Sequence, residues 1–206
     1  MSFALNEVEV TAKKATRGAG YDWGLAEEAG KATRWLCIQG LDGPTLLASL
    51  LAAGYAGELS NHRPKTLAAP WNGAESLCPL ITGSALSDCA ATLPGEIGAT
   101  TAPAILLPFV ASAARQTGKP LQLSGSGFSA WTDGDALSVQ GSIPAEVERL
   151  TLEHAGETAL GNPELTRSTP DAAAWDTLNQ FAHRIYAPAT EESRLLGAGA
   201  GLTDND

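Results

Sequence analysis

Cysteine is scarce in this chain, and its three cysteines, Cys37, Cys78 and Cys89, are widely spaced. An odd, scattered set is typical of reduced, buried thiols in a reducing compartment and argues against a disulfide framework. No cysteine pair has the short spacing of a zinc site, and the three histidines are scattered as well. We therefore expect no metal and no cofactor to be held by these residues.

Long apolar runs and positive charge are also lacking. No run approaches the roughly eighteen apolar residues needed to span a bilayer, and the first residues lack the basic and apolar regions of a signal peptide. Acidic residues outnumber basic ones by 23 to 13, which gives a net charge of −10. Because nucleic acids and anionic lipids attract basic patches, we expect a cytoplasmic protein that binds neither nucleic acid nor a membrane.

Apolar residues are plentiful enough for a folded core, at 44% of the chain against 17% charged residues. A length of 206 residues suits a single domain, which we expect to cover residues 1–206.

The first part of that domain, about residues 6–54, has the pattern of three helices. Asn6 with Glu9 forms a potential capping box for the first, and Asp22 is a potential cap for the second. A break at residues 41–44 separates the second from a leucine-rich third helix that ends at Gly54.

The next segment, about residues 55–103, is rich in glycine, proline, serine and asparagine, which interrupt every periodic run. Long irregular segments in compact domains are often functional. The alternative is that the pattern hides a short helix near Ala85 and Leu86 and a strand near Leu80 and Ile81.

Residues 104–186 have the pattern of a sheet followed by a helix. The apolar run 105–110 predicts a buried strand leading into a helix up to Gln116. Four alternating segments then predict an antiparallel meander with a hairpin turn at Asp133 and Gly134. The last predicted helix is long, with Thr169 as its cap, Pro170 as its first residue and Asp171 in an acidic first turn. It leads into an extended, glycine-rich tail, residues 187–206. The predicted fold class is therefore α+β.

Two segments resemble a bacterial family catalogued only as a domain of unknown function. The first surrounds residues 17–28 and has the sequence ATRGAGYDWGLAEEAGK over residues 15–31; the second is YAPATEESRLLGAGAGLTDND at residues 186–206. The resemblance extends over the whole chain and implies a self-contained bacterial domain. It implies no activity, cofactor or catalytic residue.

The second predicted helix carries the first candidate catalytic residues. Glu27 and Glu28 follow Trp23, and an aromatic wall beside carboxylates is typical of a substrate cleft in which a carboxyl pKa is raised. The simpler interpretation, which we favour, is that these acids complement the helix dipole and that Glu27 pairs with Lys31.

The last helix carries a second candidate group. His183, Arg184 and Tyr186 combine an imidazole, a fixed cation and a phenol, which together can bind a carboxylate substrate and move its proton. Helical spacing places His183 away from the apolar stripe, however, so an exposed histidine is the favoured interpretation.

The tail is the third candidate. Ser193 and Arg194 precede the glycines Gly197 and Gly199, and backbone amides beside an arginine suit an anion-binding loop. The pattern is neither a P-loop nor a dinucleotide fingerprint. Asp204 and Asp206 have oxygens that suit a hard cation or a partner, although such an end is usually solvated.

Three functions are consistent with these patterns. The first is an enzyme or substrate-binding subunit that acts on a small anionic or polar metabolite by acid and base chemistry. The second is a non-catalytic accessory protein, a homo-oligomer whose tail packs on a neighbouring subunit. The third, a helix-turn-helix regulator, is disfavoured because Glu27 and Glu28 interrupt the helix that would enter the DNA groove.

Overall fold

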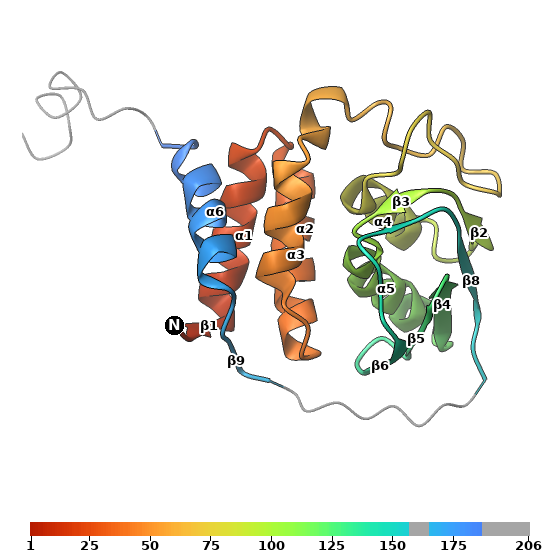
Figure 1. Cartoon of the computed structure of the whole chain (residues 1–206). Helices are drawn as coiled ribbons and strands as arrows, with labels where there is room; N and C mark the ends of the chain where they lie inside the picture. Colours follow the sequence, from red (N-terminus) through yellow and green to blue (C-terminus); the bar gives the residue numbers. More distant parts are fainter. Residues whose placement is uncertain (157–164, 187–206) are drawn as a thin grey trace, which may run out of the picture.

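The computed structural model describes residues 1–156 and 165–186, in which a group of helices is joined to a helix-covered sheet (Figure 1). The α-helices are α1 (Leu5–Gly18), α2 (Trp23–Ile38), α3 (Gly43–Ala52), α4 (Pro79–Asp88), α5 (Leu107–Thr117) and α6 (Ala172–His183). Two short 3-10 helices are η1 (Tyr55–Glu58) and η2 (Pro103–Leu106). The strands are β1 (Phe3–Ala4), β2 (Glu96–Ile97), β3 (Thr100–Thr101), β4 (Leu121–Gly125), β5 (Phe128–Thr132), β6 (Leu137–Gly141), β7 (Glu146–Val147), β8 (Leu150–His154) and β9 (Arg167–Ser168).

Aspartate caps begin three of the helices. Asp22 accepts a hydrogen bond from the backbone N–H of Leu25 at 2.8 Å, which confirms the predicted start of α2. Asp42 caps α3 and Asp171 caps α6 in the same way. Because Asp171 itself is the cap of α6, the expectation that Pro170 is the first helical residue is wrong.

The start of α1 differs from the prediction. Ala4 occupies the cap position without a side-chain hydrogen bond, because β1 pairs with β9 and the chain passes directly from that strand into the helix. Asn6 therefore lies inside the first turn, where its side-chain oxygen accepts a hydrogen bond from Arg34 at 2.9 Å.

The main sheet has the strand order β2-β8-β4-β5-β6 and is antiparallel at every pairing. The predicted α+β class and the antiparallel strands are confirmed. The predicted meander is correct for β4, β5 and β6 but wrong for β8, which pairs with β4 on its other side instead of following β6. Val139 in β6, predicted on the apolar face, is exposed.

Asp133 closes the turn between β5 and β6 by accepting hydrogen bonds from the backbone N–H groups of Asp135 and Ala136, both at 2.9 Å. Gly134 has a φ of 111°, a backbone conformation that residues with a side chain rarely adopt. Glycine therefore suits this position in the predicted hairpin turn.

Two apolar segments form helices: residues 105–110, for which a strand was predicted, and residues 80–81, for which the alternative interpretation gave a strand. The short helix of that alternative, near Ala85 and Leu86, is part of α4. Residues 105–110 lie in η2 and the first turn of α5, and residues 80–81 lie in α4. The two helices pack so closely at Gly83 that an added Cβ atom would lie 2.2 Å from a ring carbon of Phe109. Because one helix covers the other, their buried residues form continuous runs that conceal the helical period.

Two large hydrophobic clusters form most of the core, and a small third cluster of Leu5, Val8 and Cys37 joins the first turns of α1 to the end of α2. The first is concentrated between α1, α2, α3 and α6, and the second lies between α4, α5 and the main sheet. Trp35 and Leu41 contact both clusters. Helix α6 returns to lie beside α1, so that the first and last helices of the described chain are neighbours (Figure 1). None of the described helices combines the length and apolar character that crossing a membrane requires.

Candidate functional site

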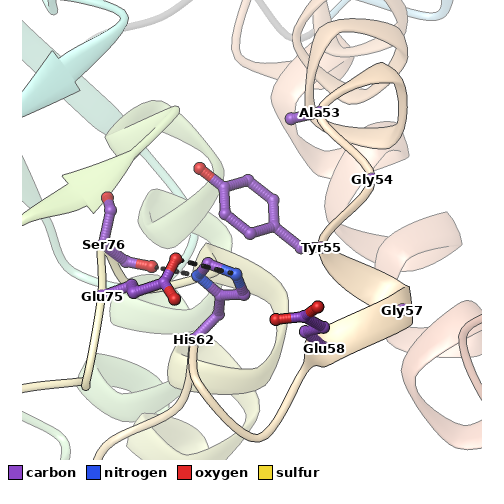
Figure 2. Close-up of a pocket in the computed structure, with 8 residues that line it drawn as sticks. All are labelled: Ala53, Gly54, Tyr55, Gly57, Glu58, His62, Glu75 and Ser76. Carbon is purple, nitrogen blue, oxygen red and sulfur yellow. Dashed lines mark hydrogen bonds and ion pairs between the residues drawn. The ribbon is translucent and has the colours of Figure 1, made fainter.

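A polar cavity of about 480 Å³ lies where the chain leaves α3 and enters the long connection to α4. We call it the His62 cavity. Its lining residues are Ala53, Gly54, Tyr55, Gly57, Glu58, His62, Glu75 and Ser76 (Figure 2).

Backbone hydrogen bonds hold the two arms of this connection together. The carbonyl oxygen of Asn61 accepts hydrogen bonds from the N–H groups of Ala74 and Glu75, both at 3.1 Å. The carbonyl oxygen of His62 accepts another from Cys78 at 2.8 Å. These bonds place residues 58–62 beside residues 74–76, which are distant in the sequence.

His62 is the central side chain of the cavity. Its Nδ1 atom lies 2.8 Å from the backbone carbonyl oxygen of Ser76. A carbonyl oxygen only accepts hydrogen bonds, so Nδ1 carries the proton and the neutral ring keeps its lone pair on Nε2. Nε2 lies 3.8 Å from Oε2 of Glu75, beyond hydrogen-bonding distance. The His62 side chain is only 12% exposed, whereas that of Glu75 is 57% exposed.

Two carboxylates flank this ring. In the view of Figure 2 the imidazole lies between Glu75 and Glu58. The side-chain amide of Asn61 donates a hydrogen bond to Glu58 at 3.1 Å and a longer one to Glu75 at 3.4 Å. This shared donor holds both carboxylates near the cavity, where they disfavour an anion and favour a cation or a hydrogen-bond donor.

Tyr55 forms an aromatic wall. Its ring meets that of His62 edge to face, with centroids 4.3 Å apart and an interplanar angle of 79°. Its hydroxyl lies 2.6 Å from the hydroxyl of Thr101 in β3, which also lies 3.1 Å from the hydroxyl of Ser76. The Thr101 hydroxyl therefore connects both arms of the cavity to the sheet-containing half of the molecule.

The described parts of the chain, residues 1–156 and 165–186, contain no group of three His, Cys, Asp or Glu residues arranged to hold a metal ion. What the His62 cavity offers is one imidazole nitrogen, carboxylate oxygens and hydroxyl groups. This set can accept a proton and bind polar groups of a small molecule.

The predicted carboxylates of α2 lie elsewhere. Glu27 forms ion pairs with Lys13 at 3.2 Å and Lys31 at 3.4 Å, and hydrogen bonds from these lysines lower the pKa of its carboxyl group. The expected raised pKa is therefore not found at Glu27. Glu28 forms an ion pair with Lys31 at 2.9 Å. These contacts support the interpretation that the two acids form ion pairs on the helix surface.

The other predicted residues surround the end of α1. The exposed ring of Trp23 lies 5.5 Å from the guanidinium of Arg17. The hydroxyl of Tyr186 accepts a hydrogen bond from Lys14 at 2.8 Å. Lys13 contacts Glu27, one of the predicted residues on α2, and the next residue, Lys14, contacts Tyr186, a predicted residue just after α6. The two predicted groups therefore lie beside the same part of α1.

At the end of α6, the rings of His183 and Tyr186 lie 6.0 Å apart, and Arg184 lies over the Phe181 ring at 4.3 Å. His183 and Arg184 are exposed, and Tyr186 is 56% exposed. A catalytic role for these residues stays a prediction. The predicted tail residues lie outside the described part of the chain: Ser193, Arg194, Gly197, Gly199, Asp204 and Asp206.

The five polar and aromatic residues of the His62 cavity were not among the predicted site residues. They all fall in residues 55–103, whose irregular composition was the only available signal. His62 and Glu75 are brought together by loop closure and follow neither the helical nor the strand period.

Comparison with known proteins finds a family match for the first part of the chain. Residues 3–92 match the model of a family described as "Protein of unknown function (DUF3726)". This match confirms the resemblance to a family without an assigned function, and it includes the predicted motif at residues 17–28 and the whole His62 cavity. The motif at residues 186–206 lies beyond the match. No curated protein and no solved structure matches the chain.

Proposed function

We propose that the His62 cavity binds a small polar or positively charged metabolite and that Nε2 of His62 accepts a proton from it. The observation that carries this proposal is the hydrogen bond between Nδ1 of His62 and the carbonyl oxygen of Ser76. It orients the ring and leaves the basic nitrogen at Nε2. The protein is then an enzyme, or a substrate-binding subunit of one, that uses acid and base chemistry.

The proton transfer is balanced within the cavity. A ligand O–H or N–H group hydrogen-bonded to Nε2 gives its proton to that nitrogen, and the ring becomes an imidazolium. Glu75, 3.8 Å from Nε2, stabilises the new positive charge, while Nδ1 keeps its bond to Ser76. The histidine returns the proton when the product carries a more basic atom at the same position.

Charge narrows the class of ligand. The sequence predicts an anionic or polar metabolite, but Glu58 and Glu75 border this cavity and oppose an anion. A neutral polyol or an amine fits the pair of carboxylates better, with the Tyr55 ring available to cover its carbon atoms.

A thermal-shift screen tests this proposal. The panel contains amines, polyols, amino acids, nucleosides and, for comparison, dicarboxylates. A ligand at about 100 times its Kd stabilises the native state by about 2.7 kcal/mol. We expect a polyol or an amine to stabilise the wild type and the His154→Asn variant, in which an exposed histidine at the end of β8 is changed.

The matched variant is His62→Asn. It should lose at least about tenfold in affinity, because the ligand's bond to Nε2 and the stabilisation of the imidazolium by Glu75 both disappear. Equal binding by His62→Asn and the wild type would place the ligand elsewhere and overturn the proposal.

The accessory role predicted from the tail depends on residues 187–206, outside the described part of the chain. Deleting these residues distinguishes the two functions. An assembly role requires the truncated protein to have a lower oligomeric mass in light scattering, and an unchanged mass contradicts it. Binding at the His62 cavity should survive the deletion.

A helix-turn-helix role has less support. The basic residues near the first two helices are largely engaged by acids: Lys13 pairs with Glu27, Lys31 with Glu27 and Glu28, and Arg34 with Glu9 at 2.9 Å. These pairs neutralise much of the local basic cluster that DNA binding would require.

A further inference from the structure

Basic and aromatic side chains gather where α1 and α6 end and α2 begins, on one side of the helical group (Figure 1). We call this the α1–α6 surface, and its residues are Lys14, Arg17, Trp23, Arg184 and Tyr186. An added Cβ atom at Gly18 would lie 3.5 Å from Cβ of Arg184, so the end of α6 lies directly against the end of α1. The surface therefore combines residues from segments that are far apart in the sequence.

The two arginines of this surface lie over aromatic rings. The guanidinium of Arg17 is 5.5 Å from the centre of the Trp23 ring, and that of Arg184 is 4.3 Å from the centre of the Phe181 ring. A ring covers one face of the planar guanidinium, whereas the five N–H donors lie in its plane. Arg17 donates one hydrogen bond to the carbonyl oxygen of Tyr21, at 3.0 Å. Both arginines therefore keep donors that can bind carboxylate oxygens.

The three cations of the α1–α6 surface have no carboxylate partner among residues 1–156 and 165–186. Lys14 instead donates to the hydroxyl oxygen of Tyr186 at 2.8 Å. The preceding residue differs, because Lys13 is paired with Glu27 at 3.2 Å. The protein as a whole has a net charge of −10. Three unpaired cations thus form a local positive area on an acidic protein, and such an area attracts a negatively charged partner.

The same surface exposes aromatic side chains. Trp23 is 54% exposed and Tyr186 is 56% exposed, and within the described ranges these are the aromatic residues among the exposed large hydrophobic side chains. Asp22, the acid next to Trp23, already accepts the capping hydrogen bond of α2. Tryptophan, tyrosine and arginine are the residues that most often dominate the binding energy of protein interfaces. Positive charge beside exposed rings therefore suits a peptide segment with acidic and apolar side chains.

We infer that the α1–α6 surface binds an acidic segment of a partner protein, whose carboxylates accept hydrogen bonds from the three cations and whose apolar side chains cover the two exposed rings. Charge complementarity selects this partner. A longer polyanion such as a nucleic acid fits less well, because it would extend past three cations onto an acidic protein. The surface shares no residue with the His62 cavity, so this inference stands independently of the function proposed above.

Fluorescence anisotropy of a labelled peptide tests this inference. The probe is a fluorescein-labelled peptide of sequence EEFEEFEEFE, and the matched control peptide is QQFQQFQQFQ, which keeps the rings and lacks the charge. We expect the full chain to bind the acidic peptide at least about tenfold more tightly than the control peptide, because hydrogen bonds to charged groups are stronger than neutral ones. Equal affinity for the two peptides would overturn the inference.

Exposed variants locate the binding surface without altering the core. Arg184→Gln removes a charged donor and Trp23→Ala removes an exposed ring, and each should weaken binding of the acidic peptide by about tenfold. Lys119→Gln is the matched control, because it removes one exposed positive charge after the end of α5, and it should bind the peptide like the wild type. Affinity that is unchanged in both Arg184→Gln and Trp23→Ala would also overturn the inference.

Two further measurements separate other occupants of the surface. An unlabelled oligonucleotide of twelve thymidines should displace the peptide only weakly, and displacement at a lower concentration than the unlabelled acidic peptide requires would assign the surface to nucleic acid instead. A protein that lacks residues 187–206 should bind the peptide like the full chain. Binding that occurs only after this deletion would assign the surface to the chain's own tail and overturn the inference of a partner protein.

Discussion

Nδ1 of His62 donates a hydrogen bond to the backbone carbonyl oxygen of Ser76, 2.8 Å away and fourteen residues later in the chain. This contact adds to the backbone bonds that join the two arms of the α3–α4 connection, and it sets which ring nitrogen is basic. The surrounding hydroxyl bonds connect the same cavity to the sheet through Thr101. Loop architecture and candidate chemistry therefore depend on the same residues.

The Tyr55 hydroxyl should contribute measurably to stability. Tyr55→Phe removes the 2.6 Å hydrogen bond between the hydroxyls of Tyr55 and Thr101. The partly buried hydroxyl of Thr101 then has one partner fewer. We expect a loss of about 1 kcal/mol in the free energy of unfolding, measured by urea denaturation. Tyr186→Phe is the matched control, because the Tyr186 ring is exposed and its lysine partner is solvated. Equal effects of the two variants would contradict this account.

Gly83 should be intolerant of any side chain. Gly83→Ala would place a methyl group 2.2 Å from a ring carbon of Phe109, so that α4 and α5 must separate. We expect the free energy of unfolding to fall by about 2 kcal/mol or more. Gly57→Ala is the control, because an added Cβ there meets nothing within 4 Å. A near-neutral Gly83→Ala variant would show that the helices are packed less closely than described.

Glu27 should make stability depend on pH. Its pKa is lowered from 4.5 in the folded state by hydrogen bonds from Lys13 and Lys31, so the folded protein binds its proton less readily than the unfolded chain. Its stabilising effect is therefore present above pH 4.5 and is lost as the pH falls through the folded-state pKa.

We expect Glu27→Gln to have a lower melting temperature than the wild type at pH 7. The difference should close under acid conditions and shrink in about 1 M salt, which screens exposed pairs. A difference that persists in acid would assign the effect to something other than these ion pairs.

The buried thiols should be slow to react. Burial raises the pKa of the Cys78 and Cys37 thiols, so little thiolate is present near neutral pH. Cys89 is less buried. We expect iodoacetamide to modify Cys89 first in the native protein, with the order read from peptide masses over time. Modification of Cys78 at the rate of Cys89 would contradict the described burial.

Much of the regular structure could be predicted because local signals and tertiary packing agree there. Asp22 caps α2 as its position predicts, and the alternation in β4 and β5 matches one buried and one less buried face. Residues 105–110 were predicted as a strand but form helix, because a fully buried helix and a buried strand both have a continuous apolar sequence. Asparagine is a common helix cap, so Asn6 was predicted to begin α1. The pairing of β1 with the distant β9 instead determines where that helix begins.

The candidate site was less predictable, for a physical reason. Helical and strand periods show which residues share a face, but His62 and Glu75 meet through backbone bonds between loop segments. Thr101 in β3 reaches the cavity through hydroxyl bonds to Tyr55 and Ser76. Their spacing in the sequence carries no period that could identify them. Glu27, by contrast, was conspicuous beside Trp23, and the structure places it in surface ion pairs.

The protonation of the His62 ring tests the central claim most directly. Long-range ¹H–¹⁵N correlation of the imidazole nitrogens reports which nitrogen carries the proton, and Asn variants of the other two histidines assign the signals. At a pH where the ring is neutral, we predict that Nδ1 is protonated and Nε2 is not. A neutral ring with its proton on Nε2 would mean that the Ser76 bond does not hold in solution, and it would contradict the proposed role of His62 as a base.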